Sequence, residues 1–503
     1  MSERQMSRSS KLKLNTVTSL INQIVTLICG FILPRYILTC FGSVQNGLVS
    51  SIGQFLGLIS LCELGVGAVV QSTLYKPLAH EDEGTVSRVM VSANRFFNKI
   101  GVIMAIYVAV LLVTYPFIYL DSFGYMSTAL LIVVMAITYF AQYFFGIKNQ
   151  ILLNADQRSY VGLILQSGTT VLNTALSIWI MSMGASIQKV KLVTSLVFLF
   201  RPLGLAMYVK KNYKIDYKMK LDGEPIKQKW NGLAQHIAAV VLGNTDTVVL
   251  TLCSTLANVS IYNVYFTVVN GVKQLVMSAT TGIQAMFGNM LAKNEREELD
   301  RSFGTVEWIL HTSTVLIFTV TGLLIIPFVR IYTDGITDAD YIVPLFAALI
   351  VSATGAYCIR LPYSMIVLAA GNYKETQTGA IIEMALNIVI SVAAVFRFGL
   401  IGVAIGTLVS MSYRTVYYAF YLKKNIINRD LNHYIKNLAV DSLTVEAIIL
   451  FAHRFNLSEV SYLAWFFLAV KVFAVALAVT FLINLLCYKR ETLGFIKAVL
   501  RIK

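Results

Sequence analysis

Charged residues are scarce in this chain: they make up only 13% of its 503 residues, while 57% are hydrophobic. Soluble domains hold about 25% charged residues, so the composition excludes a soluble fold. The charges gather in short clusters between apolar runs of roughly 20 residues, and each run is long enough to cross a bilayer as a helix. We therefore expect an all-α integral membrane protein that crosses the membrane many times.

Motifs for catalysis and cofactor binding are also missing. The five histidines and six cysteines form no H-x-x-x-H, H-E-x-x-H or C-x-x-C, and the chain has no G-x-x-x-x-G-K-[ST]. The pattern therefore predicts no catalytic residue, no metal site, no internal ATPase and no cofactor. The cysteines lie in or beside apolar segments, where they fit as small packing side chains.

Hydropathy and charge divide the chain into about fourteen transmembrane helices. The expected spans are 14–38, 44–74, 97–120, 126–147, 160–182, 189–209, 230–253, 259–290, 304–329, 342–369, 378–396, 400–422, 438–453 and 461–488. An even number of spans places both termini on the same side of the membrane.

The basic residues predict which side that is. Of the 41 lysines and arginines, 30 fall in alternate segments that include both termini, six fall in the opposite loops, and five lie within spans. Cytoplasmic loops are rich in basic residues, so we expect both termini in the cytoplasm. This bias also explains most of the net charge of +15 without a nucleic-acid partner.

The chain contains an internal duplication. Segment 197–212 matches 410–425 at an offset of 213 residues, which aligns Arg201 with Arg414 and two Lys-Lys-Asn endings. Segments 78–88 and 151–157 match later segments at offsets of 213 and 215. Such repetition predicts two parallel six-helix lobes that face a central cleft, plus two C-terminal helices. The expected division is an N-lobe at 1–209, a basic cytoplasmic linker at 210–229, a C-lobe at 230–425, and spans thirteen and fourteen with the tail at 426–503.

Ionisable and amide residues inside the spans are the candidates for function, because charge within a membrane is costly unless it faces water or a partner. Lys273 flanks a polar stripe in the eighth span, and Asn22 belongs to a similar stripe in the first. The candidates for substrate binding in the cleft are Lys273, Arg201, Arg414, Arg360, Asn270, Gln274 and Asn22. The candidates for ion coupling are Asp246, Glu383 and Glu63.

Each candidate also has a structural interpretation. The polar stripes fit interhelical hydrogen bonds in a packed bundle, and the duplicated arginines fit ion pairs with Glu63, Asp246 or Glu383. Arg360 lies two residues before Pro362, where the helix loses a backbone hydrogen bond and is expected to bend. Glu307, near the inner end of its span, is set aside.

Several segments resemble the Wzx-type bacterial polysaccharide flippases, which belong to the multidrug/oligosaccharidyl-lipid/polysaccharide exporter superfamily. They are LPRYILTCFGSVQNGLVSSIGQFLGLISLCELGVGAVV at 33–70, GNTDTVVL at 243–250, YNVYFTVVNGVKQLV at 262–276, and the sixth and twelfth spans with their arginines. The resemblance implies a protein that moves an undecaprenyl-diphosphate-linked oligosaccharide across the cytoplasmic membrane by alternating access. It also implies membrane lipids, a proton or sodium ion and other polysaccharide assembly proteins as partners.

Four classes of function remain in view. A flippase for lipid-linked oligosaccharide needs cations for the diphosphate and amides for the sugars, and the spans contain both. A cation-coupled multidrug exporter of the same fold is the main alternative, and an acidic cleft would suit it better. A membrane enzyme would need larger outer loops, and a scaffold would not need charges within the membrane.

Overall fold

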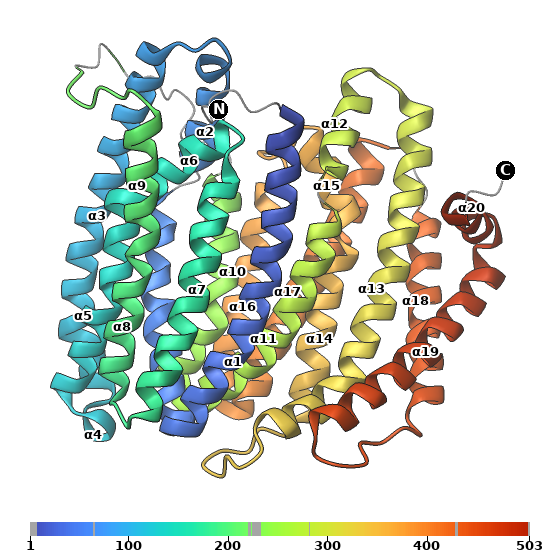
Figure 1. The fold of residues 1–503 in the computed structure, drawn as a ribbon. Coiled ribbons are helices and arrows are strands. Elements are labelled where there is room, and N and C mark those ends of the chain that lie inside the picture. Colours follow the sequence, from blue (N-terminus) through green and yellow to red (C-terminus); the bar gives the residue numbers. More distant parts are fainter. Residues whose placement is uncertain are drawn as a thin grey trace. The chain divides into compact units, whose positions relative to one another are not determined.

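The computed structural model describes residues 8–63, 66–219, 223, 233–280, 282–427 and 431–500. These residues form helices and connecting turns, with no β-strand among them (Figure 1). Within the described chain, eleven helices have the length and apolar composition to cross a membrane. The predicted fold class, an all-α multi-pass membrane protein, is therefore confirmed.

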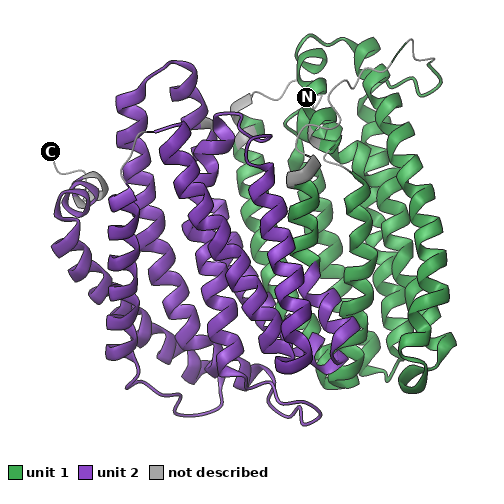
Figure 2. Cartoon of the chain, turned by 180° about the vertical axis from the view of Figure 1, so that it is seen from behind, with its two compact units in different colours: residues 1–244 green, residues 245–503 purple. Residues whose placement is uncertain are grey.

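The chain separates into two compact units, Met1–Asn244 and Thr245–Lys503 (Figure 2). The helices of the first unit are α1 (Arg8–Gly57), α2 (Val66–Ala79), α3 (Glu83–Ile118), α4 (Leu120–Phe123), α5 (Tyr125–Ala141), α6 (Ile147–Ala155), α7 (Ser159–Ser182), α8 (Ile187–Phe198), α9 (Phe200–Asn212) and the start of α10 (Leu233–Cys253). The second unit contains the rest of α10 and α11 (Leu256–Ala279), α12 (Ile283–Ala292), α13 (Arg296–Tyr332), α14 (Pro344–Ile359), α15 (Leu361–Ala369), α16 (Gln377–Phe398), α17 (Leu400–Asn425), α18 (Leu431–Ala452), α19 (Tyr462–Cys487) and α20 (Lys489–Leu500).

The predicted linker 210–229 lies mostly outside the described residues: its first three residues end α9, and 220–222 and 224–229 are not described. The predicted boundaries of the lobes, their parallel relationship and the cleft between them stay predictions.

Within the described residues, each of the fourteen expected spans overlaps one or more helices. The first two lie in α1, which consists of two helices that meet at a kink: the backbone of Gly42, with φ of 79° and ψ of 176°, is not helical. The second span also covers the short 3₁₀ helix (Leu58–Glu63) and the start of α2. The eighth span covers most of α11 and of α12, and the thirteenth covers most of α18; these helices are not among the eleven apolar helices. The polar stripe lies in α11, and α18 contains three charged residues, Lys436, Asp441 and Glu446.

Several helix ends are set by side chains that accept backbone hydrogen bonds. Asp82 caps α3 by accepting from the Thr85 N–H at 2.9 Å, and these hydrogen bonds hold the pKa of the Asp82 carboxyl below its usual value. Ser461 caps α19 in the same way through Ala464. Because the caps stand between apolar stretches, they fix where the spans begin.

Close contact between α16 and α17 organises the second unit. Gly399, with φ of 54°, makes the turn between the two helices, and Gly402 faces the backbone of Ala394. A Cβ at Gly402 would lie 2.5 Å from the Ala394 carbonyl oxygen, so only glycine fits there. The short interhelical distance brings polar side chains of α16 directly against those of α17.

The last two spans pack on α13 through polar as well as apolar contacts. Trp465 of α19 donates from Nε1 to the Leu324 carbonyl at 3.2 Å, within a cluster that includes Ala452 and Val472. Further along, Trp308 of α13 donates to the Asn484 side chain at 2.7 Å. The C-terminal pair is therefore an integral part of the second unit.

Candidate functional site

A buried carboxylate, Glu383 on α16, joins two of the predicted arginines. It forms an ion pair with Arg360, and the Arg414 Nε lies 3.8 Å from its other oxygen. Arg360 stands where α14 ends and α15 begins, two residues before Pro362, so the predicted break in the helix places its side chain toward α16. All three residues are buried.

Arg414 is held on every side. Its guanidinium donates to the Thr376 carbonyl at 3.0 Å and to the Tyr418 hydroxyl at 2.9 Å, and it lies 4.4 Å from the Tyr418 ring centroid. The side chain is 1% exposed, which makes it one of the largest fully buried groups in the chain. A buried arginine is tolerated when its donors are satisfied in this way.

The predicted Lys273 of α11 joins the same cluster through an aromatic ring. Its ammonium lies 5.1 Å from the ring centroid of Tyr357, and the Arg360 guanidinium lies 4.4 Å from the same ring. Cation–π contacts of this kind contribute about 0.5–2 kcal/mol each. The cluster thus gathers three cations, Lys273, Arg360 and Arg414, around the single carboxylate of Glu383.

An excess of positive charge in a low-dielectric region favours an anion as a further partner. Lys273 is the cation of the cluster that is least buried, and it lies beside Asn270, which is half-buried, and Gln274, which is exposed. An anionic group that reaches Lys273 could also form hydrogen bonds with these two amides.

Asp246 forms a second polar layer in the same unit. Its carboxylate accepts from the Thr407 hydroxyl at 2.8 Å and the Tyr262 hydroxyl at 3.0 Å, with the Asn387 amide at 3.5 Å. Asn387 lies one turn from Glu383 on α16, so this layer is next to the cationic cluster.

The Asp246 layer is rich in oxygen and poor in cations. No lysine or arginine is recorded in an ion pair with Asp246 in the described part of the chain, and the Asn387 Oδ1 is buried without a hydrogen-bond partner. The Val403 carbonyl lies 3.1 Å from the Thr407 hydroxyl. Carboxylate, amide and carbonyl oxygens suit a hard cation or a proton. No group of three His, Cys, Asp or Glu side chains that could hold a metal ion occurs among the described residues.

The candidates in the first unit are separate from one another. Glu63 accepts from the Tyr143 hydroxyl at 2.8 Å. Asn22 of α1 accepts from Ser167 of α7 at 3.1 Å, and Asn15 likewise bonds the Tyr160 N–H at 2.8 Å. Hydrogen bonds between α1 and α7 therefore use the polar stripe of the first span.

Arg201 differs from its duplicated twin. It lies at the start of α9, where α8 ends at Phe198, and its Nε is buried without a hydrogen-bond partner. In the part of the chain that the structure describes, no carboxylate is recorded in an ion pair with it. The two arginines thus occupy matching places in the sequence but different electrostatic environments.

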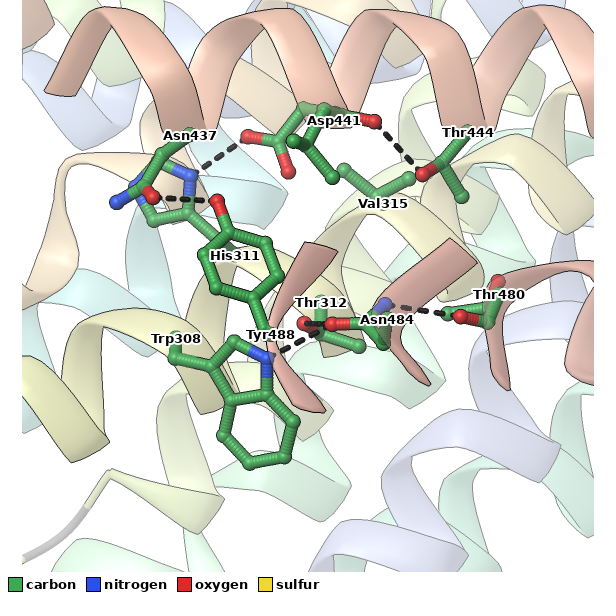
Figure 3. A pocket seen from close by; sticks show the side chains of 11 residues that line it. Trp308, His311, Thr312, Val315, Asn437, Asp441, Thr444, Thr480, Asn484 and Tyr488 are labelled. Atoms are coloured by element: carbon green, nitrogen blue, oxygen red, sulfur yellow. Dashed lines mark hydrogen bonds and ion pairs between the residues drawn. The ribbon is translucent and has the colours of Figure 1, made fainter. Parts of the chain in front are cut away.

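A third polar network escaped the sequence analysis. His311 of α13 contacts Asp441 of α18 and Tyr363 of α15, and Tyr363 bonds Glu307. Figure 3 shows His311 and Asp441 facing each other beside Trp308 and Asn484. Glu307 and His311 are four residues apart, on one face of a helix, which was a usable signal. Asp441 lies 130 residues from His311 in the sequence, so no local pattern indicated that the two side chains meet.

Solved structures of membrane transporters share this fold. The lipid II flippase MurJ in an inward closed conformation matches with a TM-score of 0.70 and 14% identity, over 94% of this chain and 98% of that chain. An outward-facing multidrug resistance MATE family transporter of the MOP superfamily matches with a TM-score of 0.53 and 15% identity, over 83% of this chain and 95% of that chain. The eukaryotic MATE transporter AtDTX14 matches with a TM-score of 0.51 and 11% identity, over 82% and 96%.

No protein-family model matches the sequence, and no curated protein matches it either. At identities of 11–15% the likeness is one of fold. The chain therefore has the fold shared by the lipid II flippase MurJ and the MATE transporters.

Proposed function

We propose that this protein is a flippase that moves an undecaprenyl-diphosphate-linked oligosaccharide across the bacterial cytoplasmic membrane during surface polysaccharide biosynthesis. Both termini lie in the cytoplasm in this proposal, as the basic loops predict. The resemblance to Wzx-type flippases and the fold shared with MurJ support this class of substrate.

The cationic cluster around Glu383 is the observation that favours an anionic lipid headgroup. Lys273, Arg360 and Arg414 outnumber the one carboxylate between them. A diphosphate supplies the missing negative charge and accepts charge-assisted hydrogen bonds. Lys273 is the residue that binds it in this proposal, because Arg414 already has its donors satisfied within the protein.

The neighbouring Asp246 layer is the coupling site in this proposal. A sodium ion or a proton there would neutralise Asp246 and change the hydrogen bonds that Thr407 and Asn387 make between α16 and α17. Because Asn387 and Glu383 share α16, such a change would reach the cationic cluster directly. Ion binding and headgroup binding would then be linked through the same pair of helices.

Replacing Lys273 tests the site in cells that depend on this chain for surface polysaccharide. Loss of a hydrogen bond to a charged group costs about 1.5–3 kcal/mol, which is roughly a ten- to hundredfold lower translocation rate. Lys273→Ala should therefore reduce surface polysaccharide and raise the amount of lipid-linked oligosaccharide that faces the cytoplasm. Membrane abundance, checked by blot, should match the wild type.

Lys471→Ala is the matched control, because Lys471 is also a lysine within a span but is exposed on α19. It should leave polysaccharide output unchanged. Equal effects of the two substitutions would remove Lys273 from the site. If deletion of the whole gene spared the polysaccharide and sensitised cells to ethidium, the function would be drug export and the proposal would be wrong.

A further inference from the structure

The buried network on α13, α15 and α18 has four titratable members in a row. The Asp441 Oδ2 lies 2.6 Å from the His311 Nδ1, the His311 Nε2 lies 3.1 Å from the Tyr363 hydroxyl, and that hydroxyl lies 2.6 Å from the Glu307 Oε1. His311, Tyr363 and Glu307 are at most 3% exposed. Neither the cationic cluster nor the Asp246 layer uses these residues.

The donors and acceptors of this row can be assigned in two ways on the same heavy atoms. In one arrangement Glu307 is protonated and donates to Tyr363, Tyr363 donates to His311 Nε2, and the His311 Nδ1–H donates to the Asp441 carboxylate. In the other, Asp441 is protonated and donates to His311 Nδ1, the His311 Nε2–H donates to Tyr363, and Tyr363 donates to the Glu307 carboxylate. Every hydrogen bond of the row is satisfied in both, since imidazole and phenol can each donate and accept.

We propose that Asp441, His311, Tyr363 and Glu307 form a proton relay within the second unit. One proton leaves Glu307 for the Tyr363 oxygen, the Tyr363 proton passes to His311 Nε2, and the His311 Nδ1 proton passes to Asp441 Oδ2. Only O–H and N–H bonds break and form, and one proton moves from Glu307 to Asp441. The imidazole ends in its other tautomer, which is a direct signature of the step.

Each end of the relay borders a small cavity that polar and apolar side chains line. The Asp441 end lines a cavity of about 10 Å³, about the size of one water molecule, together with Asn437, Thr480 and Asn484 (Figure 3). The Thr480 hydroxyl in that wall is buried and has no hydrogen-bond partner. These features give a proton a polar route onward from Asp441.

The Glu307 end lines a second cavity, of about 20 Å³, with Tyr363, Lys423 and His433. His433 is exposed, so this end connects to the surface of the unit. The relay therefore has one end beside the exposed His433 and the other at Asp441, whose side chain is 14% exposed. The other ionisable groups that face it are Lys423 of α17, Tyr434 of α18 and Tyr488 beside α20.

A purely structural hydrogen-bond network would use the same contacts to hold α18 against α13, so the experiment must detect proton movement. Nitrogen-15 NMR of the purified full-length protein in nanodiscs distinguishes the two neutral tautomers of an imidazole. The chain has only five histidines, and the His311 signal is identified by its loss in His311→Gln. If that variant does not fold, a chain with the other four histidines replaced by glutamine identifies it instead.

The two arrangements hold the same number of protons, so their ratio does not depend on pH. The relay therefore predicts that wild-type His311 populates both the Nδ1–H and the Nε2–H tautomers throughout the pH range in which the row keeps its transferable proton. Tyr363→Phe keeps the ring and both carboxyls but interrupts the row, so His311 should then hold one protonation state over the same pH range. Trp308→Phe, which removes a hydrogen bond in the same cavity without a titratable group, should behave as the wild type. A single His311 form at every pH in the wild type, or unchanged exchange in Tyr363→Phe, would overturn the relay.

Discussion

The duplicated arginines offer a sharp test, because identical substitutions should have opposite consequences. Arg414→Ala removes a partner of Glu383 and the donors to Thr376 and Tyr418 inside the second unit. Breaking one side of a buried ion pair costs about 3–5 kcal/mol. Net stabilities of proteins are about 5–15 kcal/mol, so this loss is a large fraction of the total.

Changes of about 1–2 kcal/mol already alter cellular abundance several-fold. Arg414→Ala should therefore leave little folded protein in the membrane, as measured by blot of isolated membranes and by size-exclusion chromatography of tagged protein in detergent. Arg414→Lys keeps the charge but loses the planar fork, and it should fall between the alanine variant and the wild type.

Arg201→Ala should give the opposite result. No protein partner of the Arg201 side chain is recorded within the described residues, and its Nε is buried without a hydrogen bond. Its removal abolishes a desolvation cost, so abundance and chromatographic behaviour should match the wild type. Translocation should fall, because the sequence predicts Arg201 as a substrate-binding residue. Equal loss of abundance in Arg201→Ala and Arg414→Ala would refute the distinction between a ligand-binding and a structural arginine.

Two further predictions concern the second unit. Asp246→Asn should make translocation insensitive to collapse of the proton and sodium gradients, because the amide cannot take up either cation. The measurement is translocation with and without ionophores. A response equal to that of the wild type would exclude Asp246 as the coupling site. Gly402→Ala should lower the thermal stability of the detergent-solubilised protein, since its Cβ would lie 2.5 Å from the Ala394 oxygen. Gly168→Ala is the control and should leave the stability unchanged, because no atom lies within 4 Å of the new Cβ. Equal stability of the two variants would contradict the close packing of α16 on α17.

Hydropathy predicted the helices well because an apolar span in lipid must make the hydrogen bonds of its backbone internally, as a helix does. The break expected between the first two spans, at 39–43, coincides with the kink at Gly42, because glycine readily adopts the positive φ that interrupts the helix there. The polar stripe of α11 was visible as a period of three to four residues. It also kept α11 out of the set of strongly apolar helices.

The residues of the site were predictable from the sequence, but the contacts among them were not. Sequence named Lys273, Arg360, Glu383 and Arg414 separately, and their convergence depends on the close contact of α16 with α17 and on the break at Arg360. The duplication suggested equal roles for Arg201 and Arg414. The residues around the two arginines differ, so their interactions differ as well.

His311 was overlooked because a histidine motif was sought along the chain. Its partner Asp441 lies in a helix outside the duplication.

The most direct test of the central claim is a binding measurement on the full chain in nanodiscs. A short-chain polyprenyl diphosphate sugar, the corresponding monophosphate and ethidium should be compared for the wild type, Lys273→Ala and Lys471→Ala. The cationic cluster predicts that the diphosphate binds most tightly, and that Lys273→Ala weakens it about tenfold or more while Lys471→Ala does not. Equal affinity for diphosphate and monophosphate, a preference for ethidium, or no effect of Lys273→Ala would contradict it.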